Sequence, residues 1–344
     1  MKKLVILLLL SLVVFWGCAQ KEPTEQAPKG GWGFIDTTGN MVIQPQFETA
    51  KPFSEGMAAV VTGGRWGFID KTGKFVIPAQ FDNADSFAHG RAAVNVNGKW
   101  GYVDKLGHMV IGTAFDNAQP FAEGGLAGVK QGTKWGYVDF RGQMAIPAQF
   151  DNVQPFSEDR GGFQSMGMQA QGWGFVDPSG KRVIPEKYES VKPFKNGVAE
   201  FKTFDGRYGL IDKDGIFVYK EQTELPSYFS EGLAIVPGKG KLGYADQKGR
   251  IVIEPQYDQA DMFSEGLAMV RKEFRYGYID RSGTEVVKPQ YEKATPFKED
   301  FAAVKLVNGR WGYLNKDGKL AIEPIYDEAL PFSEGLAAVK QEAK

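Results

Sequence analysis

The chain has 344 residues, a formal net charge of -1 from 41 Lys and Arg against 42 Asp and Glu, two histidines and one cysteine. This near-neutral balance gives no electrostatic reason to expect a nucleic-acid partner. Because Cys18 is the only cysteine, the rest of the chain has neither a thiolate nucleophile nor a cysteine-based zinc site.

The first segment has the composition of a targeting sequence. Lys2 and Lys3 precede an apolar run over residues 4–16, which is shorter than the roughly 20 residues that a membrane-spanning helix needs. We therefore expect residues 1–17 to be a signal peptide. The run ends in V-F-W-G-C, which resembles the lipobox of bacterial lipoproteins. The resemblance implies a lipid on Cys18 that holds the mature protein on a membrane of the bacterial cell envelope, facing the periplasm or the cell exterior.

Residues 18–31 contain mainly Lys, Glu, Gln, Thr, Pro and Gly, so we interpret them as the lipidated cysteine and a flexible tether. Residues 32–344 form one domain of nine similar units, each close to W-G-[FY]-[IV]-D-x-x-G-x-x-V-I-x-P-x-[FY]-[DE]-x-A-x-P-F-x-E-G-L-A-x-V. A period of about 35 residues is typical of a solenoid, a propeller or another array. The units start at Trp32, Trp66, Trp100, Trp135, Trp173, Tyr208, Leu242, Tyr276 and Trp311.

One unit predicts three short strands. Residues 66–70 alternate as a strand, and Asp70 with Gly73 predicts a tight turn into a second strand over 74–77, which a proline ends. An irregular stretch with two fixed aromatics follows, which we interpret as a loop pinned to the core by its rings. A Glu-Gly turn then leads into a third strand, such as residues 336–339, that continues into the next unit.

A unit of this size cannot bury its own apolar face, so we expect stability to come from stacking on neighbouring units. The unit is shorter than the about 40 to 45 residues of a four-stranded propeller blade, which favours an all-β, open β-hairpin solenoid. The alternative is a closed ring or β-propeller. The chain begins on the Trp32 strand without its preceding partner and ends on Leu336–Val339, and a ring would join these two halves in one sheet.

The recurring Trp-Gly-[Phe/Tyr]-[Ile/Val]-Asp, with Val-Ile-x-Pro and Phe-x-Glu-Gly-Leu-Ala-x-Val downstream, resembles the WG-repeat family of bacterial proteins over residues 32–339. The resemblance implies a β-rich array with a binding role and no catalytic residues to carry over. The chain departs from the pattern at Tyr208, Leu242 and Tyr276, where Trp is absent. It also departs in two broken segments, residues 157–172 and 216–227.

Two sets of repeated side chains are candidates for structure or binding. The first is a structural ladder of tryptophans at Trp32, Trp66, Trp100, Trp135, Trp173 and Trp311. The second is a stripe of cations that immediately precede the tryptophan position, at Arg65, Lys99, Lys134, Arg207, Lys241, Arg275 and Arg310. The stripe fits charges that keep strand ends soluble, and alternatively a ligand stripe for an anionic or sugar polymer.

Catalysis would need residues that break the repeat, and none forms a recognisable constellation. His89 and His108 lie in predicted turns and are interpreted as exposed substitutions. We expect no enzyme, no catalytic residues, no metal site and no cofactor. The predicted function is a noncatalytic, lipid-anchored envelope protein that binds or scaffolds an unknown protein partner through its repeat surface, with the specific site in the two broken segments. The alternative is a module that binds a cell-wall polymer, either a glycan or peptidoglycan.

Overall fold

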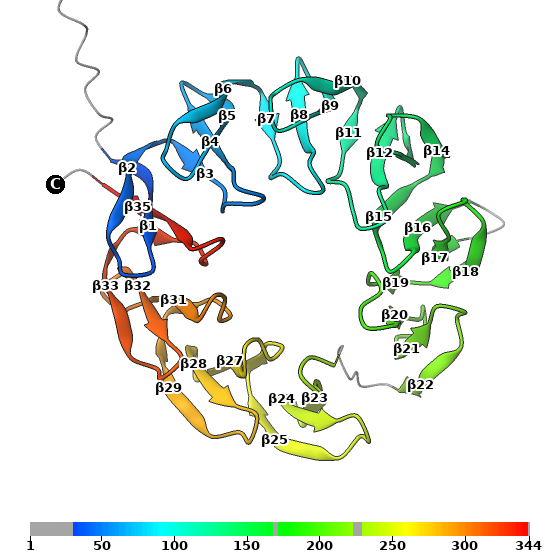
Figure 1. The fold of residues 1–344 in the computed structure, drawn as a ribbon. Helices are drawn as coiled ribbons and strands as arrows, with labels where there is room; N and C mark the ends of the chain where they lie inside the picture. Colours follow the sequence, from blue (N-terminus) through cyan, green and yellow to red (C-terminus); the bar gives the residue numbers. More distant parts are fainter. Residues whose placement is uncertain (1–29, 168–170, 223–228, 343–344) are drawn as a thin grey trace, which may run out of the picture.

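The chain folds as a closed ring of small antiparallel sheets (Figure 1). The computed structural model describes residues 30–167, 171–222 and 229–342, so the predicted signal peptide and Cys18 lie outside the described residues. The described residues form nine sheets, which we number as blades 1 to 9 in chain order. Blade 1 is β3–β6, blade 2 is β7–β10, blade 3 is β11–β14, blade 4 is β15–β18, blade 5 is β19–β22, blade 6 is β23–β25, blade 7 is β26–β29, blade 8 is β30–β33, and blade 9 joins β34 and β35 to β1 and β2.

Each complete blade has four strands from the inside of the ring to the outside, in sequence order except in blade 9, where β34 and β35 are followed by β1 and β2. The first strands are β3 (Thr49–Ala50), β7 (Asn83–Ala84), β11 (Asn117–Ala118), β15 (Asn152–Ser157), β19 (Ser190–Val191), β26 (Gln259–Ala260), β30 (Lys293–Ala294) and β34 (Glu328–Ala329). The second strands are β4 (Ala58–Thr62), β8 (Ala92–Val96), β12 (Ala127–Gln131), β16 (Arg160–Met166), β20 (Val198–Lys202), β23 (Leu233–Gly238), β27 (Leu267–Lys272), β31 (Phe301–Lys305) and β35 (Leu336–Gln341).

The third and fourth strands form the outer hairpin of each blade. The third strands are β5 (Arg65–Ile69), β9 (Lys99–Val103), β13 (Lys134–Val138), β17 (Gln171–Val176), β21 (Tyr208–Asp212), β24 (Lys241–Asp246), β28 (Arg275–Asp280), β32 (Trp311–Asn315) and β1 (Gly31–Asp36). The fourth strands are β6 (Phe75–Phe81), β10 (Met109–Phe115), β14 (Met144–Phe150), β18 (Arg182–Tyr188), β22 (Phe217–Gln222), β25 (Ile251–Tyr257), β29 (Glu285–Tyr291), β33 (Leu320–Tyr326) and β2 (Met41–Phe47).

The prediction of an open solenoid is wrong, and the alternative of a closed ring or propeller holds. Strand β35 pairs antiparallel with β1 over six positions, from Gly31 opposite Gln341 to Asp36 opposite Leu336. The last strand of the chain therefore completes the blade that the first strands begin. The two half-units at the ends of the sequence point to this closure, because neither has a partner for its exposed strand edge until they meet.

The prediction of three strands per unit is also wrong, because the stretch interpreted as a loop supplies an inner strand. Thr49 and Ala50 pair with Val61 and Val60, and equivalent two-residue strands occur in the other complete blades except blade 4, whose first strand β15 has six residues. A strand of two residues lets four strands fit into a unit of about 35 residues, which is why unit length misled the choice between solenoid and propeller. The aromatic residues of this stretch are buried as expected, with Phe81 4% and Phe87 2% exposed.

The hydrophobic core lies between adjacent blades. Phe68 of blade 1 contacts Phe87 of the next blade edge to face, with ring centroids 4.8 Å apart, and both rings are almost fully buried. Within a blade, the glycine after the tryptophan position allows a close crossing of the third and fourth strands. A Cβ atom on Gly67 would lie 2.6 Å from the backbone nitrogen of Ala79, at a point where the pairing register shifts.

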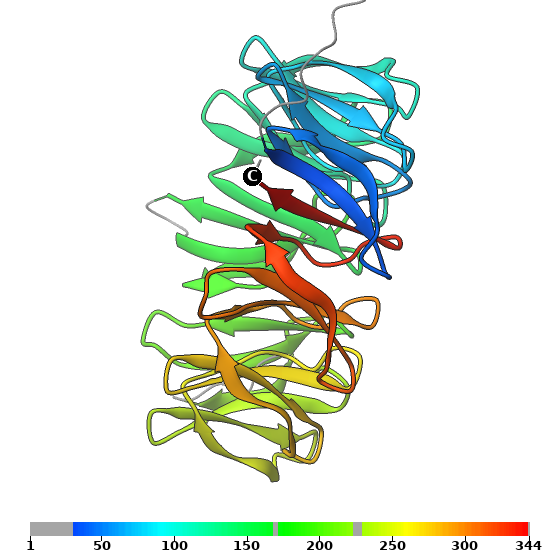
Figure 2. The same cartoon turned by 90° about the vertical axis from the view of Figure 1, so that its left-hand side faces the viewer.

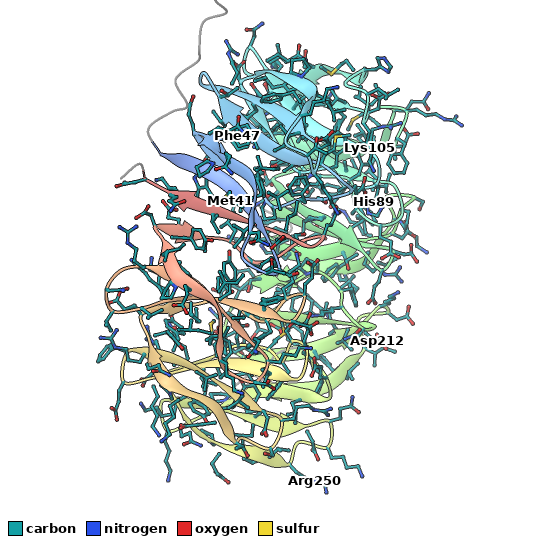
Figure 3. The ribbon with its side chains drawn as sticks, turned by 60° about the vertical axis from the view of Figure 1, so that its left-hand side comes forward. Met41, Phe47, His89, Lys105, Asp212 and Arg250 are labelled. Atoms are coloured by element: carbon teal, nitrogen blue, oxygen red, sulfur yellow. The ribbon has the colours of Figure 1, made fainter. Side chains whose placement is uncertain are left out.

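The hairpin between third and fourth strands is closed by its own aspartate. In blade 5, Asp212 Oδ1 accepts hydrogen bonds from the N–H groups of Asp214 at 3.0 Å and Ile216 at 2.9 Å, and Gly215 takes a φ of 77°. Figure 3 shows Asp212, His89 and Lys105 toward the same edge of the ring. No segment of the described residues is a helix long and apolar enough to cross a membrane.

Candidate functional site

Two rims of the ring carry the side chains that sequence analysis singled out. We call the rim with the turns between first and second strands the clamp rim; it also carries the hairpins between third and fourth strands. We call the opposite rim, with the hairpins between second and third strands, the hairpin rim. Figure 2 views the ring from its side, and the red turn before β35 and the C-terminal end of β35 lie on opposite rims.

The predicted cation stripe lies on the hairpin rim, and its members are paired with carboxylates. Lys99 Nζ lies 2.5 Å from Asp116 Oδ1, and Lys134 Nζ lies 2.5 Å from Asp151 Oδ1. The remaining pairs are Arg65 with Asp82, Lys241 with Asp258, Arg310 with Asp327, Arg275 with Glu292, and Arg207 with Asp205. The stripe is thus balanced within the protein, which leaves little excess positive charge for a polymer.

Several of these carboxylates also connect neighbouring blades. Asp116 follows blade 2, yet its Oδ2 accepts a hydrogen bond of 2.6 Å from the N–H of Gly132 in blade 3. The hydrogen bonds from Lys99 and from Gly132 hold the pKa of Asp116 below its ordinary value. Asp151 likewise accepts hydrogen bonds from Lys134 Nζ and from the N–H of Met166. The stripe and its partners therefore act as links between blades.

The predicted tryptophan ladder is distributed over the gaps between blades. Trp32 is 7% exposed, and the other five tryptophans of the set are half-buried. Trp66 lies opposite Phe81 in its own blade, and Lys51 Nζ lies 5.3 Å above its ring. The most buried aromatic is the one two residues further along, such as Phe68, which is 0% exposed. That aromatic is the larger contribution to the core.

The clamp rim is held by a chain of glutamates that runs from blade to blade. Glu265 of blade 7 accepts hydrogen bonds from the N–H groups of Glu299 at 2.8 Å and Asp300 at 2.9 Å in blade 8, and Lys316 Nζ lies 3.4 Å from its Oε2. Five other turn glutamates bind a backbone N–H of the next blade in this way: Glu55, Glu158, Glu231, Glu299 and Glu334. We call this contact the glutamate clamp.

Loss of one clamp should cost a measurable share of stability. For Glu265→Ala we expect the free energy of unfolding to fall by about 1 kcal/mol, because two turn amides lose a charged acceptor but remain accessible to water. Urea unfolding followed by fluorescence measures it. Glu123→Ala is the matched control, since Glu123 binds no amide of the next blade among the described residues, and its effect should stay within about 0.5 kcal/mol. Equal losses in both variants would contradict a special role for the clamp.

The clamp is missing at three of the nine junctions that the described residues form, and at two of these three junctions both clamp partners are replaced. Between blades 2 and 3, His89 stands where the glutamate belongs, and Phe140 stands where Lys105 and Lys316 stand in their hairpins. Between blades 5 and 6, Asn196 and Gln247 occupy the corresponding positions. His89 and Asn196 keep the left-handed backbone of the turn, with φ of 52° and 55°. The turn is retained while the link is lost.

A hollow of about 610 Å³ opens at the first of these junctions. His89, Glu123, Phe140 and Arg141 supply its chemistry, together with the glycine pair at 124–125. The ring of Phe140 is 39% exposed and stacks on Phe121, with centroids 4.6 Å apart and planes inclined by 21°. An aromatic face held in place, with one cation and one carboxylate beside it, is an arrangement that can bind an extended ligand.

A second hollow, of about 280 Å³, opens at the other broken junction. It is lined by Asn196, Val218, Phe229, Glu231 and Gln247 among others. Val218 belongs to the second broken segment of the sequence, which continues into residues outside the described ones. The first broken segment forms most of the extended hairpin of β16 and β17, except residues 168–170, which are also outside the described residues. The site prediction for these two segments stays a prediction.

Sequence reasoning named His89 and passed over Glu123, Phe140 and Arg141. Aligning the nine units shows that the lysine of the Asp-Lys-x-Gly turn is replaced two units after each replaced glutamate, by Phe140 and by Gln247. Because Thr37, Pro178 and Arg281 also replace this lysine, the paired changes become meaningful only when the turn of one blade is known to face the hairpin of the next. His108, the other histidine, lies on the hairpin of blade 2 with Nδ1 3.1 Å from Asp104 Oδ2.

The described residues contain no group of three or more His, Cys, Asp or Glu placed to hold a metal ion. Their geometry is that of a closed, repeat-built propeller with clamps at six of its junctions and a hollow at two of the three junctions without a clamp.

The chain belongs to the WG containing repeat family. The family model matches residues 32–66, 66–100, 100–135, 135–165, 173–208, 243–273, 276–311 and 311–344. In the unmatched stretch between residues 208 and 243, where the second broken segment departs from the pattern, the described residues still form β21 and β22 of blade 5 and β23 of blade 6.

Similar solved structures are found at low sequence identity. A eukaryotic initiation factor superposes with a TM-score of 0.61 at 11% identity, covering 92% of this chain and 98% of that one. BamB from Moraxella catarrhalis matches with a TM-score of 0.44 at 13% identity, covering 86% of this chain and 97% of that one. No curated protein matches the chain by sequence.

Proposed function

We propose that this protein is a noncatalytic binding scaffold of the bacterial cell envelope, which captures a protein partner at the hollow between blades 2 and 3. The observation that carries the proposal is the coincidence of three features at one junction. The clamp is absent, an exposed aromatic ring replaces its cation, and a hollow of about 610 Å³ opens there. In a regular array, function is expected at a position that departs from the repeated pattern.

The chemistry of the hollow suits a peptide segment. Phe140 offers an apolar face, and the side chains of Glu123 and Arg141 form no ion pair among the described residues. A partner segment with an apolar side chain flanked by opposite charges would cover the ring and neutralise both groups. The fixed stacking on Phe121 reduces the ordering cost of binding, because Phe140 is already held before the partner arrives.

The envelope location is part of the same proposal. It rests on the charged and apolar start of the chain and on the lipobox-like sequence that ends at Cys18, the only cysteine. A lipid on that cysteine would keep the ring on a membrane surface, where a scaffold meets its partners at high local concentration. Binding of a cell-wall polymer is the competing function, and the paired state of the cation stripe counts against it.

The test compares capture of envelope proteins by the lipidated protein and by two variants. Phe140→Ser should reduce retention of the specific partner at least tenfold, the equivalent of about 1.4 kcal/mol. Leu106→Ser, a matched exposed apolar residue on the hairpin of blade 2, should retain it fully. Thermal unfolding of both variants checks that the fold is intact. Retention of purified cell-wall polymer, with no protein captured, would replace this proposal by the polymer-binding alternative.

A further inference from the structure

The hairpin rim carries exposed apolar side chains on one side of the ring. Met166, Phe204, Phe274 and Val307 lie at or beside the hairpin tips of blades 4, 5, 7 and 8, and they are 64%, 58%, 83% and 67% exposed. Lys239 occupies the tip of blade 6 between them. The tips of blades 1 to 3 contain Gly63 and Gly64, Asn97 and Gly98, and Gly132 and Thr133. We call the sector from blade 4 to blade 8 the apolar arc.

The hairpin tip of blade 7 has two residues that its left-handed backbone conformation disfavours. Glu273 and Phe274 take φ of 51° and 64°, the left-handed region that Asn and Gly occupy most easily. Blade 2 uses Asn97 and Gly98 at the equivalent hairpin, with φ of 52° and 80°. Phe274 therefore combines an unfavourable backbone with an almost fully exposed apolar ring. Neither feature stabilises the ring, so the side chain is better explained by something outside it.

The chain enters the ring at the same rim. Strand β1 begins at Gly31, opposite Gln341 at the end of β35, which is the end of the sheet that corresponds to the hairpin tips of the other blades. Blade 9, which holds this entry point, is next to blade 8 and the end of the apolar arc (Figure 1). Even fully extended, the residues from Cys18 to Gly30 reach only about 40 Å. A membrane attachment at Cys18 would thus keep this rim close to the bilayer.

The character of the arc fits a lipid surface. Its apolar side chains stand on separate hairpins, an arrangement that a fluid bilayer interface can receive without a matching shape. Lys239 and Lys272 lie in the same sector and have no ion pair among the described residues. Ammonium groups beside apolar side chains are attracted to anionic head groups while the apolar groups enter the acyl boundary.

The sector also contains acidic groups, and most of them are neutralised locally. Asp205 pairs with Arg207, Glu292 with Arg275, and Asp327 with Arg310, while Asp258 pairs with Lys241. Glu273, at the tip of blade 7, is a nearby carboxylate that forms no ion pair among the described residues. The paired carboxylates do not oppose approach to an anionic surface as free ones would.

We propose that the apolar arc docks on the lipid bilayer, so that the hairpin rim faces the membrane and the clamp rim, with the hollow at Phe140, faces away. This orientation rests on the lipid anchor of the proposed function and adds to it a second contact, because one acyl-bearing residue and an apolar surface together hold a protein more firmly than either alone. It presents the partner site to the compartment instead of to the membrane.

Site-specific fluorescence on the lipidated full chain tests the orientation. Val307→Cys places a polarity-sensitive dye in the arc, and Leu106→Cys places the same dye on a hairpin of the clamp rim, where the native side chain is 73% exposed. A lipidated Cys18 carries its sulfur as a thioether, so the introduced cysteine is the only free thiol. The probe membrane is a vesicle of phosphatidylethanolamine with one-fifth phosphatidylglycerol.

We expect the dye at position 307 to shift to shorter emission wavelength and to be quenched several-fold more strongly by quencher-bearing lipids than the dye at 106. Adding Phe204→Ser and Phe274→Ser to the 307 reporter should remove most of this difference while the protein still floats with the vesicles. Thermal unfolding confirms that the doubly substituted ring is folded.

Three outcomes would overturn the orientation, and they are distinguishable. A protein that does not float with vesicles refutes the anchor and the orientation that depends on it. A protein that floats with equal quenching at 307 and 106 refutes the orientation and leaves the anchor standing. Shielding of position 307 only after envelope proteins are added assigns the apolar arc to a protein partner instead of a lipid surface.

Discussion

A chain that ends at Gly335 should lose the cooperative unfolding transition of the native ring. The truncation removes β35, which pairs with β1 over six positions and buries Leu336, Ala337, Ala338 and Val339 between blades. Without it, blade 9 is reduced to its outer hairpin, and the cores on both of its sides are exposed to water. The expected loss exceeds about 5 kcal/mol, which is comparable with the whole stability of many domains.

The size of this effect separates a ring from an open array. In an open array a terminal unit contacts one neighbour, so its removal would leave the remaining units folded with nearly unchanged stability. In the ring the same residues join the two ends of the chain. A truncated chain that keeps the melting temperature and the sharpness of the parent would therefore contradict the closed architecture.

Point substitutions in β35 provide the matched comparison. Val339 is 0% exposed and lies opposite Gly33, whereas Gln341 lies at the half-exposed end of the strand opposite Gly31. Val339→Asp should approach the effect of the truncation, because it places a carboxylate in the core without a partner. Gln341→Asp should change the free energy of unfolding by less than about 0.5 kcal/mol. Calorimetry measures both against the parent chain.

The sequence predicts the repeating hairpin well because its signals are local. Strict alternation over Trp66–Asp70 and the Asp-to-Gly turn that follows leave few other conformations, and both appear in the structure. The inner strand escapes such reasoning because two residues, such as Asn83 and Ala84, cannot display a period of two. It pairs with the predicted third strand of the same unit, with Asn83 opposite Asn95, across an irregular turn that carries no hairpin signal. The choice between solenoid and propeller depended on that strand.

The candidate site was less predictable, for a related reason. The cation stripe is visible in sequence, but the carboxylate that neutralises Lys99 lies 17 residues away at Asp116, beyond the whole fourth strand. The exposed ring of Phe140 has meaning only beside His89, which belongs to a different blade. Contacts between blades are set by the ring geometry. The sequence of one unit therefore predicts the fold of that unit, but it does not predict which residues of the adjacent blades that unit contacts.

The ring should unfold steeply in alkali, because five tyrosine hydroxyls are buried in its core. Tyr102, Tyr137, Tyr244, Tyr278 and Tyr313 occupy the aromatic position of the third strand. In each the hydroxyl donates a hydrogen bond to a backbone carbonyl 17 residues further on, as from Tyr137 to Gln154 at 2.8 Å. Burial raises the pKa of each of these tyrosines far above the ordinary value of 10.0.

The direction of the effect follows from proton binding. Above about pH 10 the unfolded chain loses its tyrosine protons while the folded ring keeps them, so stability is complete below that pH and falls as the pH rises toward the folded pKa. Each tyrosine contributes a slope of about 1.4 kcal/mol per pH unit, and five together give about 7 kcal/mol per unit. A stability of about 5 to 15 kcal/mol would then vanish within about two units above pH 10.

A variant with all five tyrosines changed to phenylalanine isolates this contribution from the lysine ion pairs, which also weaken in alkali. Phenylalanine already occupies the position as Phe34, Phe68 and Phe175 in other blades, so the ring should fold, at a cost of about 1 kcal/mol for each lost hydrogen bond. Its alkaline slope should be markedly shallower. In the parent, tyrosinate absorbance and loss of near-ultraviolet circular dichroism should rise together; ionisation of these tyrosines at pH 10 in a ring that is still folded would contradict their burial.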